Sequence, residues 1–180
     1  IATKVTSQKV LPGATISDTF TAEGLVPEVA GRKITYTVTG ALYGPVKGTD
    51  GSCEAVDWTD AKIAVEIDEF EIEGDENGKA EISGIGKYTV ADTLDDCYTY
   101  GEELTATIEP GNGIEDKPIT WTHKPGQESQ TTITTQPNPK IATKVTSQKV
   151  LPGATISDTF TAEGLVPRSP AGRSPTPSPA

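Results

Sequence analysis

The sequence contains very few of the residues from which metal and redox centres are usually built. Its 180 residues include one histidine, two cysteines and no methionine. These numbers exclude a His-rich or multi-Cys metal site, and no CxxC pair suggests redox catalysis. There is also no glycine-rich phosphate loop and no nucleophile elbow. We therefore expect no cofactor, no bound metal and no enzyme that turns over.

Positive charge is also scarce. Fifteen Lys and Arg residues stand against 26 Asp and Glu, which gives a formal net charge of −11 at pH 7 and a pI of about 4.5. An acidic balance of this size argues against binding to nucleic acid or to an anionic membrane surface. No apolar run approaches the roughly 18 residues that a membrane-spanning helix needs. We expect neither nucleic acid nor a membrane among the partners.

Threonine, glycine and proline are abundant instead, and the pattern is β throughout. No segment keeps a helical period, and alternating segments are separated by turn signals such as LPGA, GTDGS, GDENG and EPGNG. About seven to nine short strands in about 140 residues predict an all-β, Ig-like two-sheet sandwich. The expected strands are IATKVTSQ, TISDTFTA, KITYTVTGALYG, KIAVEIDEFEIE, KAEISGI, KYTVADTL, ELTATIE, PITWTH and SQTTITT.

An internal repeat sets the domain organisation. Residues 1–27 recur without a change at 141–167, and a period of this length corresponds to a whole domain. We expect an Ig-like domain at 1–135, a Pro-rich linker at 136–140, and the first strands of an incomplete next repeat at 141–167. The Pro- and Ser-rich tail at 168–180 has no residues for a core and is expected to be disordered. Tandem domains on stiff linkers are typical of a stalk, whose partners are its neighbouring repeats.

The two cysteines, Cys53 and Cys97, lie in GSCEAVDW and DDCYTY. Two cysteines in a β-domain of extracellular type are candidates for a single disulfide. The alternative is a pair of buried free thiols, which the extracellular character of the chain makes less favourable.

The remaining candidate residues lie near the two ends of the first domain. In IATKV, alternation turns Thr3 inward between two apolar neighbours, and in TISDTF it turns Asp18 inward together with Ile16 and Phe20. In PITWTH, alternation places His123 on one face with Ile119 and Trp121, and the two apolar side chains indicate that this face is inward. Acidic and amide side chains lie near His123 in sequence, namely Glu109, Glu128 and Gln130. Strict alternation puts Gln130 on the face of Thr132, so a β-bulge is expected to re-aim it.

The order of these motifs resembles a known family. IATKVT, ISDTF, GLVP, YTVTGALY, TIEPGNG and HKPGQESQT together look like the Thr–Gln ester-bond domains, or VaFE-type repeats, of Gram-positive surface adhesins. The resemblance covers residues 1–135. It implies that Thr3 is the nucleophile, that Gln130 is the electrophile and that His123 assists proton transfer. It also implies a close acidic pair, Glu109 and Glu128, of which one carboxyl keeps its proton.

The resemblance implies a function as well. It predicts a structural stalk module of a cell-wall-anchored adhesin, extracellular on a Gram-positive bacterium and cross-linked once by autocatalysis for mechanical and proteolytic stability. Two alternatives stay open: an Ig-like module that binds a host glycan or protein, and a stalk domain with a Lys–Asn isopeptide bond from Lys4 or Lys33. The acidic loops GTDG and GDENG lack the spacing of a Ca²⁺ loop and are interpreted as solvated turns.

The duplicated segment supports one more hypothesis. Thr143 stands in the same IATKV context as Thr3, and Ile141, Val145, Ile156 and Phe160 would form an exposed apolar edge if the segment stayed unpaired. Exchange of identical elements is a low-cost route to oligomers. We hypothesise that 141–167 can occupy the site of 1–27 in a second molecule, with Thr143 bonded to that molecule's Gln130.

Overall fold

The computed structural model describes residues 1–111, 117–136 and 140–163. The chain divides into two units, Ile1–Thr135 and Gln136–Ala180, which are described separately below. Most of the expected linker at 136–140 and the whole expected tail at 168–180 lie outside the described residues. Within the described residues there is no α-helix, and no helix there is long and apolar enough to cross a membrane.

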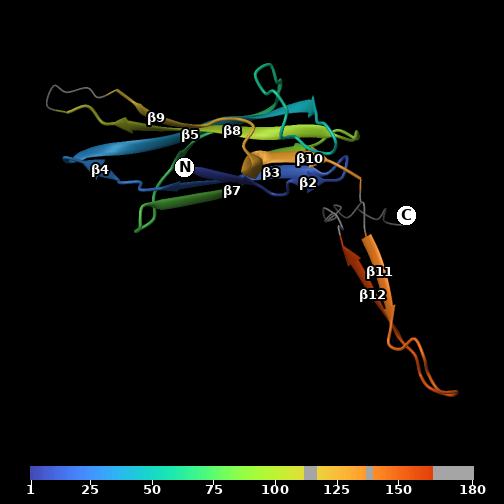
Figure 1. Ribbon diagram of the computed structural model, residues 1–180. Coiled ribbons are helices and arrows are strands. Elements are labelled where there is room, and N and C mark those ends of the chain that lie inside the picture. Colours follow the sequence, from blue (N-terminus) through green and yellow to red (C-terminus); the bar gives the residue numbers. More distant parts are fainter. Residues whose placement is uncertain (112–116, 137–139, 164–180) are drawn as a thin grey trace, which may run out of the picture. The chain divides into compact units, whose positions relative to one another are not determined.

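The first unit is a sandwich of two β-sheets (Figure 1). One sheet has the order β1-β3-β7, and the other has the order β2-β10-β8-β5-β4, with β6 paired to β5 and β9 paired to β8. The strands are β1 (Ala2–Val5), β2 (Lys9–Val10), β3 (Thr15–Glu23), β4 (Glu28–Val29), β5 (Arg32–Lys47), β6 (Ile63–Ile72), β7 (Lys79–Thr89), β8 (Asp96–Ile108), β9 (Ile119–His123) and β10 (Thr131–Thr134). The placement of β1, β3 and β7 opposite β10, β8 and β5 follows the immunoglobulin pattern. The predicted all-β sandwich is confirmed.

Alternation along the strands builds the core between the sheets. Every second residue of β3 and β8 points inward, as a pleated strand facing one core requires. The buried apolar side chains form two clusters, one around Phe20, Val38, Ile72 and Leu104, the other around Val5, Ile16, Leu42, Tyr98 and Tyr100. The site described below lies on the same inward faces.

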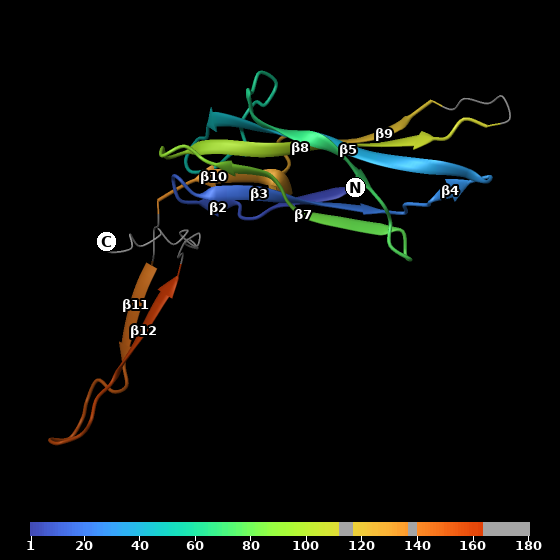
Figure 2. The same ribbon diagram turned by 180° about the vertical axis from the view of Figure 1, so that it is seen from behind.

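The first segment of the chain crosses from one sheet to the other. β1 runs antiparallel to β3, whereas β2 runs parallel to β10, with Lys9 opposite Ile133. The Thr132 hydroxyl donates a 2.6 Å hydrogen bond to the Ser7 carbonyl, which holds the crossing point against the last strand. Figure 2 shows β2 and β10 in the same layer from behind. The two ends of the domain are therefore neighbours.

Three details differ from the sequence-based strands. KAEISGI and the first three residues of KYTVADTL form the single strand β7, whose register against β3 shifts near Asp18. Gly86 has φ +56°, and a Cβ there would lie 2.8 Å from the Tyr100 ring, so this irregular stretch requires glycine. β8 begins at Asp96, before the expected start at Glu103. Ile119 and Trp121 are exposed, and in the described part of the chain their strand, β9, is an edge strand that pairs only with β8.

The predicted Cys53–Cys97 disulfide is present. It joins the segment after β5 to the beginning of β8, where Cys97 is fully buried. The bond spans 44 residues of sequence, so it constrains a large part of the unfolded chain.

We expect the double variant Cys53→Ala/Cys97→Ala to lose about 4 kcal/mol of stability, the value that loop-closure entropy gives for a loop of this length. Urea unfolding with and without reductant measures the change. The wild-type chain, denatured without reductant, should show no thiol that reacts with a labelling reagent. Two reactive thiols in that sample would contradict the disulfide.

The second unit contains one described hairpin, formed by β11 (Lys140–Val145) and β12 (Asp158–Glu163). The strands are antiparallel, and Thr143 lies opposite Phe160. Nearly all of its described side chains are exposed.

Candidate functional site

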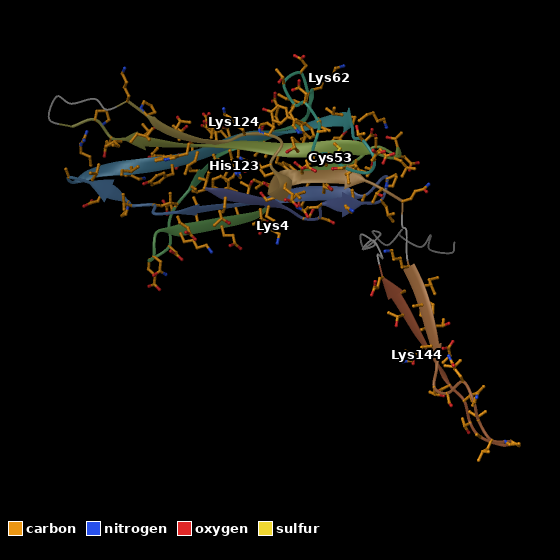
Figure 3. The ribbon with its side chains drawn as sticks, in the orientation of Figure 1. Lys4, Cys53, Lys62, His123, Lys124 and Lys144 are labelled. Carbon is orange, nitrogen blue, oxygen red and sulfur yellow. A yellow bond between two sulfur atoms is a disulfide. The ribbon has the colours of Figure 1, made fainter. Side chains whose placement is uncertain are left out.

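The structure brings Thr3 and His123 into direct contact. Thr3 is buried on β1, on the inward face that the sequence predicts. Its Oγ1 lies 2.9 Å from Nδ1 of His123. His123 ends β9 and sits directly opposite Glu102 of β8, so both side chains lie on the same side of the sheet. Figure 3 labels His123 in the first unit.

The other nitrogen of the imidazole ring has its own partner. Nε2 of His123 lies 3.1 Å from Oε1 of Gln127. When Nε2–H donates to this amide oxygen, Nδ1 carries no proton and accepts the hydrogen of the Thr3 hydroxyl. Gln127 therefore favours the tautomer in which His123 acts as a base toward Thr3.

Gln130 is fully buried and lies in a short 3-10 turn, η1 (Glu128–Gln130), just before β10. Its Nε2 donates a 2.6 Å hydrogen bond to Oε2 of Glu102. The expected bulge in a strand is wrong: the turn itself aims the side chain inward. The contacts of η1 with β1 bring Gln130 toward the strand that carries Thr3.

The acidic pair inside the sandwich consists of Asp18 and Glu102, both almost completely buried. The expectation that Glu109 and Glu128 form this pair is wrong, because both side chains are exposed. Glu109 follows the end of β8, on the solvent side of the domain. Glu128 begins η1, where its backbone carbonyl accepts a hydrogen bond from the Gln8 side chain.

Burial controls the protonation of this acidic pair. It raises the pKa of Glu102 to about 9, and the neighbouring Asp18 carboxyl adds to the rise. Contacts with Gln130 and Thr3 lower the pKa of Glu102 by less. Burial also raises the pKa of Asp18. Glu102 therefore keeps its proton at neutral pH while its carboxyl accepts the hydrogen bond of Gln130.

The site also concentrates unsatisfied polar atoms. Four buried side-chain oxygens in the described part of the chain have no hydrogen-bond partner: both carboxyl oxygens of Asp18, Oε1 of Glu102 and Oε1 of Gln130. Buried polar atoms are nearly always paired in folded proteins, so a cluster of unpaired ones is costly for stability. They belong to Gln130 itself, to Glu102, which accepts the hydrogen bond of Gln130, and to Asp18, whose carboxyl neighbours that of Glu102.

A surface cleft lies over β5, β6, β8 and β9, and Glu102 and His123 are among the residues that line it, with Tyr43, Gly101 and Pro125. Neither Thr3 nor Gln130 lines this cleft.

The structure gives the isopeptide alternative no support. Lys4 and Lys33 are both exposed, and Lys4 is labelled in Figure 3. A buried amine close to a carboxyl group, as that reaction needs, is found at neither position.

Among the residues that the structure describes, no three His, Cys, Asp or Glu side chains group in a way that could hold a metal ion.

Sequence reasoning missed Asp18 as a site residue although it placed Asp18 on the inward face. Glu102 was missed altogether. Its signal is the inward series Tyr98, Tyr100, Glu102, Leu104 and Ala106, in which one acidic residue interrupts a buried face.

Comparison with known proteins adds no family assignment: no protein-family model matches the chain, and no curated protein sequence matches it.

Proposed function

We propose that the domain at 1–135 closes on itself through an ester bond between Thr3 and Gln130, and that it serves as a cross-linked stalk module of a bacterial surface adhesin. One observation carries the proposal. The buried carboxyl of Glu102 accepts a hydrogen bond from the Gln130 amide, while Oγ1 of Thr3 lies 2.9 Å from Nδ1 of His123.

The reaction needs only these side chains. Nδ1 of His123 accepts the Thr3 hydroxyl proton while Oγ1 attacks Cδ of Gln130. The bond from Cδ to Nε2 then breaks, and the protonated Glu102 gives its proton to Nε2, so that ammonia leaves. His123 then gives the proton that it took from Thr3 to the Glu102 carboxylate, so that both residues return to their starting protonation states. The products are one ester and one ammonia, and the reaction occurs once per chain.

Prepositioning of the reacting groups accounts for much of the expected rate. Parallel pairing of β2 with β10 and packing of β1 against η1 bring the turn that carries Gln130 close to the strand that carries Thr3. Groups held in this way react with high effective molarity. Burial of Glu102 keeps an acid protonated at a pH where free carboxyls are ionised.

The assignment to a stalk follows from the position of the cross-link. A bond between the first strand and the turn before the last strand ties the two ends of the domain, where pulling on tandem repeats acts. The disulfide, the acidic surface and the exact repeat support an extracellular, tandemly arranged protein.

The test is the intact mass of the purified chain. After reduction of the disulfide, the wild-type chain is expected to be lighter than its sequence mass by one ammonia, and the monomer of Thr3→Ala is expected to show the full sequence mass of that variant. Thr143→Ala is the matched control, since it changes the same residue in the same sequence context, and it should keep the loss of ammonia. A folded wild-type chain with its full sequence mass would overturn the proposal.

A further inference from the structure

The second unit reproduces the first hairpin of the domain. In β1 and β3, Thr3 lies opposite Phe20 and Val5 opposite Asp18. In β11 and β12 the corresponding pairs are Thr143 with Phe160 and Val145 with Asp158. The hairpin therefore has the same register in both places, although only one of them belongs to a sandwich.

The hydrogen bonds inside the two hairpins also agree. The amide of Thr6 donates to the Ser17 carbonyl at 2.9 Å, and the amide of Thr146 donates to the Ser157 carbonyl at the same distance. The turns agree as well: the amide of Ala14 donates to the Leu11 carbonyl at 3.1 Å, and the amide of Ala154 donates to the Leu151 carbonyl at the same distance. The segment at 140–163 thus already has the conformation that the sandwich uses.

The surroundings of the two hairpins differ. Phe20 and Ile16 are 0% and 1% exposed, whereas Phe160 and Ile156 are 65% and 59% exposed. β3 is extended to nine residues along β7, while β12 has six residues and, in the described part of the chain, pairs only with β11. The second hairpin presents the apolar face and the open strand edge by which the first one joins the sandwich.

We propose that hairpin 140–163 of one chain takes the place of hairpin 1–23 in a second copy of the chain and becomes covalently bound there. This inference rests on the proposed ester chemistry. In the exchanged position β12 pairs with β7 of the second copy, and Thr143 stands where Thr3 stands, beside His123 and Glu102. Oγ1 of Thr143 then bonds to Cδ of Gln130, the bond to Nε2 breaks, and ammonia leaves with the hydroxyl proton.

Competition decides when exchange occurs. The first hairpin of each chain is covalently attached to its own domain and has the higher effective concentration. Once its Thr3 has reacted, the site is closed to any other hairpin. An unreacted domain stays open, and each exchange event at such a domain is trapped by a bond. Chains therefore accumulate as a head-to-tail series when Thr3 cannot react.

The experiment uses the full chain with Thr3→Ala, kept at high protein concentration and then analysed on reducing, denaturing gels. We expect a ladder of oligomers that grows with concentration and time. Thr3→Ala/Thr143→Ala should give monomers only, and Thr3→Ala/Thr143→Ser should restore the ladder because serine keeps the hydroxyl. If Thr3→Ala does not fold, Thr3→Val, which keeps the shape of the side chain without its hydroxyl, replaces it in all three chains.

Peptide mapping identifies the bond in the ladder. Trypsin releases the same peptide, IATK, from residues 1–4 and 141–144 of the wild-type chain, but Thr3→Ala changes the first to IAAK. An IATK peptide joined to the peptide of Gln130 supports the exchange. Monomers alone from folded Thr3→Ala, with wild type lighter by one ammonia, overturn the exchange and leave the proposed function intact. Wild type without the loss of ammonia overturns the proposed function itself.

Discussion

Replacing Thr3 with alanine is expected to lower the free energy of unfolding by about 5 kcal/mol, the largest effect of any single substitution that we expect in this chain. A bond from Thr3 to Gln130 closes a loop of roughly 130 residues, and the loop-entropy model assigns about 5 kcal/mol to a loop of that size. Thr3→Ala leaves the unfolded chain without this constraint. Urea unfolding followed by the signal of Trp58 and Trp121 measures the difference.

Two control variants distinguish the stability that comes from the ester bond from the stability that comes from side-chain packing at Thr3. Thr3→Ser keeps a hydroxyl at the same position and should keep most of the stability. Thr143→Ala makes the same change in the repeated sequence and should leave the unfolding of the domain unchanged. A loss of only about 1 kcal/mol in Thr3→Ala, the size of one missing hydrogen bond to His123, would contradict the cross-link.

Glu102→Gln is expected to slow ester formation by a factor of about 10² to 10⁴, the usual contribution of a general acid. Glutamine fills the same space but has no proton to give to the leaving nitrogen. Glu103→Gln is the matched control, because Glu103 is the next residue of β8 and its side chain is exposed. The rate is measured by diluting unfolded, unreacted chains from urea and following the loss of ammonia by mass spectrometry.

The pH dependence of this rate has a definite direction. Glu102 gives a proton only while it is protonated, and its pKa in the folded domain is about 9. The rate in the wild-type chain should therefore fall as the pH rises through about 9, and Glu102→Gln should lack this fall. Equal rates for Glu102→Gln and the wild type at neutral pH would remove Glu102 from the reaction.

Most of the fold could be predicted because each sheet buries one face. Alternation in IATKV and TISDTF placed Thr3 and Asp18 inward correctly, since a one-residue error would expose the whole apolar face. Alternation failed where the sheet has an edge. Ile119 and Trp121 lie on the side of Leu104 and Ala106 but remain exposed, because side-chain direction does not reveal how far the opposite sheet extends.

The site was harder to predict than the fold. Gln130 lies in a turn, and no periodic pattern describes the direction of a side chain in a single 3-10 turn. Glu102 follows Gly101 and precedes a second glutamate, so the local sequence has the composition of a solvated turn although it belongs to a long strand. Nearness to His123 along the chain favoured Glu128, whereas the acid directly opposite His123 lies on the neighbouring strand.

The disulfide lies entirely inside the segment that the proposed ester encloses, since Cys53 and Cys97 fall between Thr3 and Gln130. The polypeptide then has two nested rings, the smaller within the larger, and only short ends of the domain remain linear. Such a chain cannot spread into an ordinary coil even in strong denaturant. Its denatured form is a bicyclic polymer of small hydrodynamic radius, which opens to full length only when the thiol bond and the ester bond have both been cleaved.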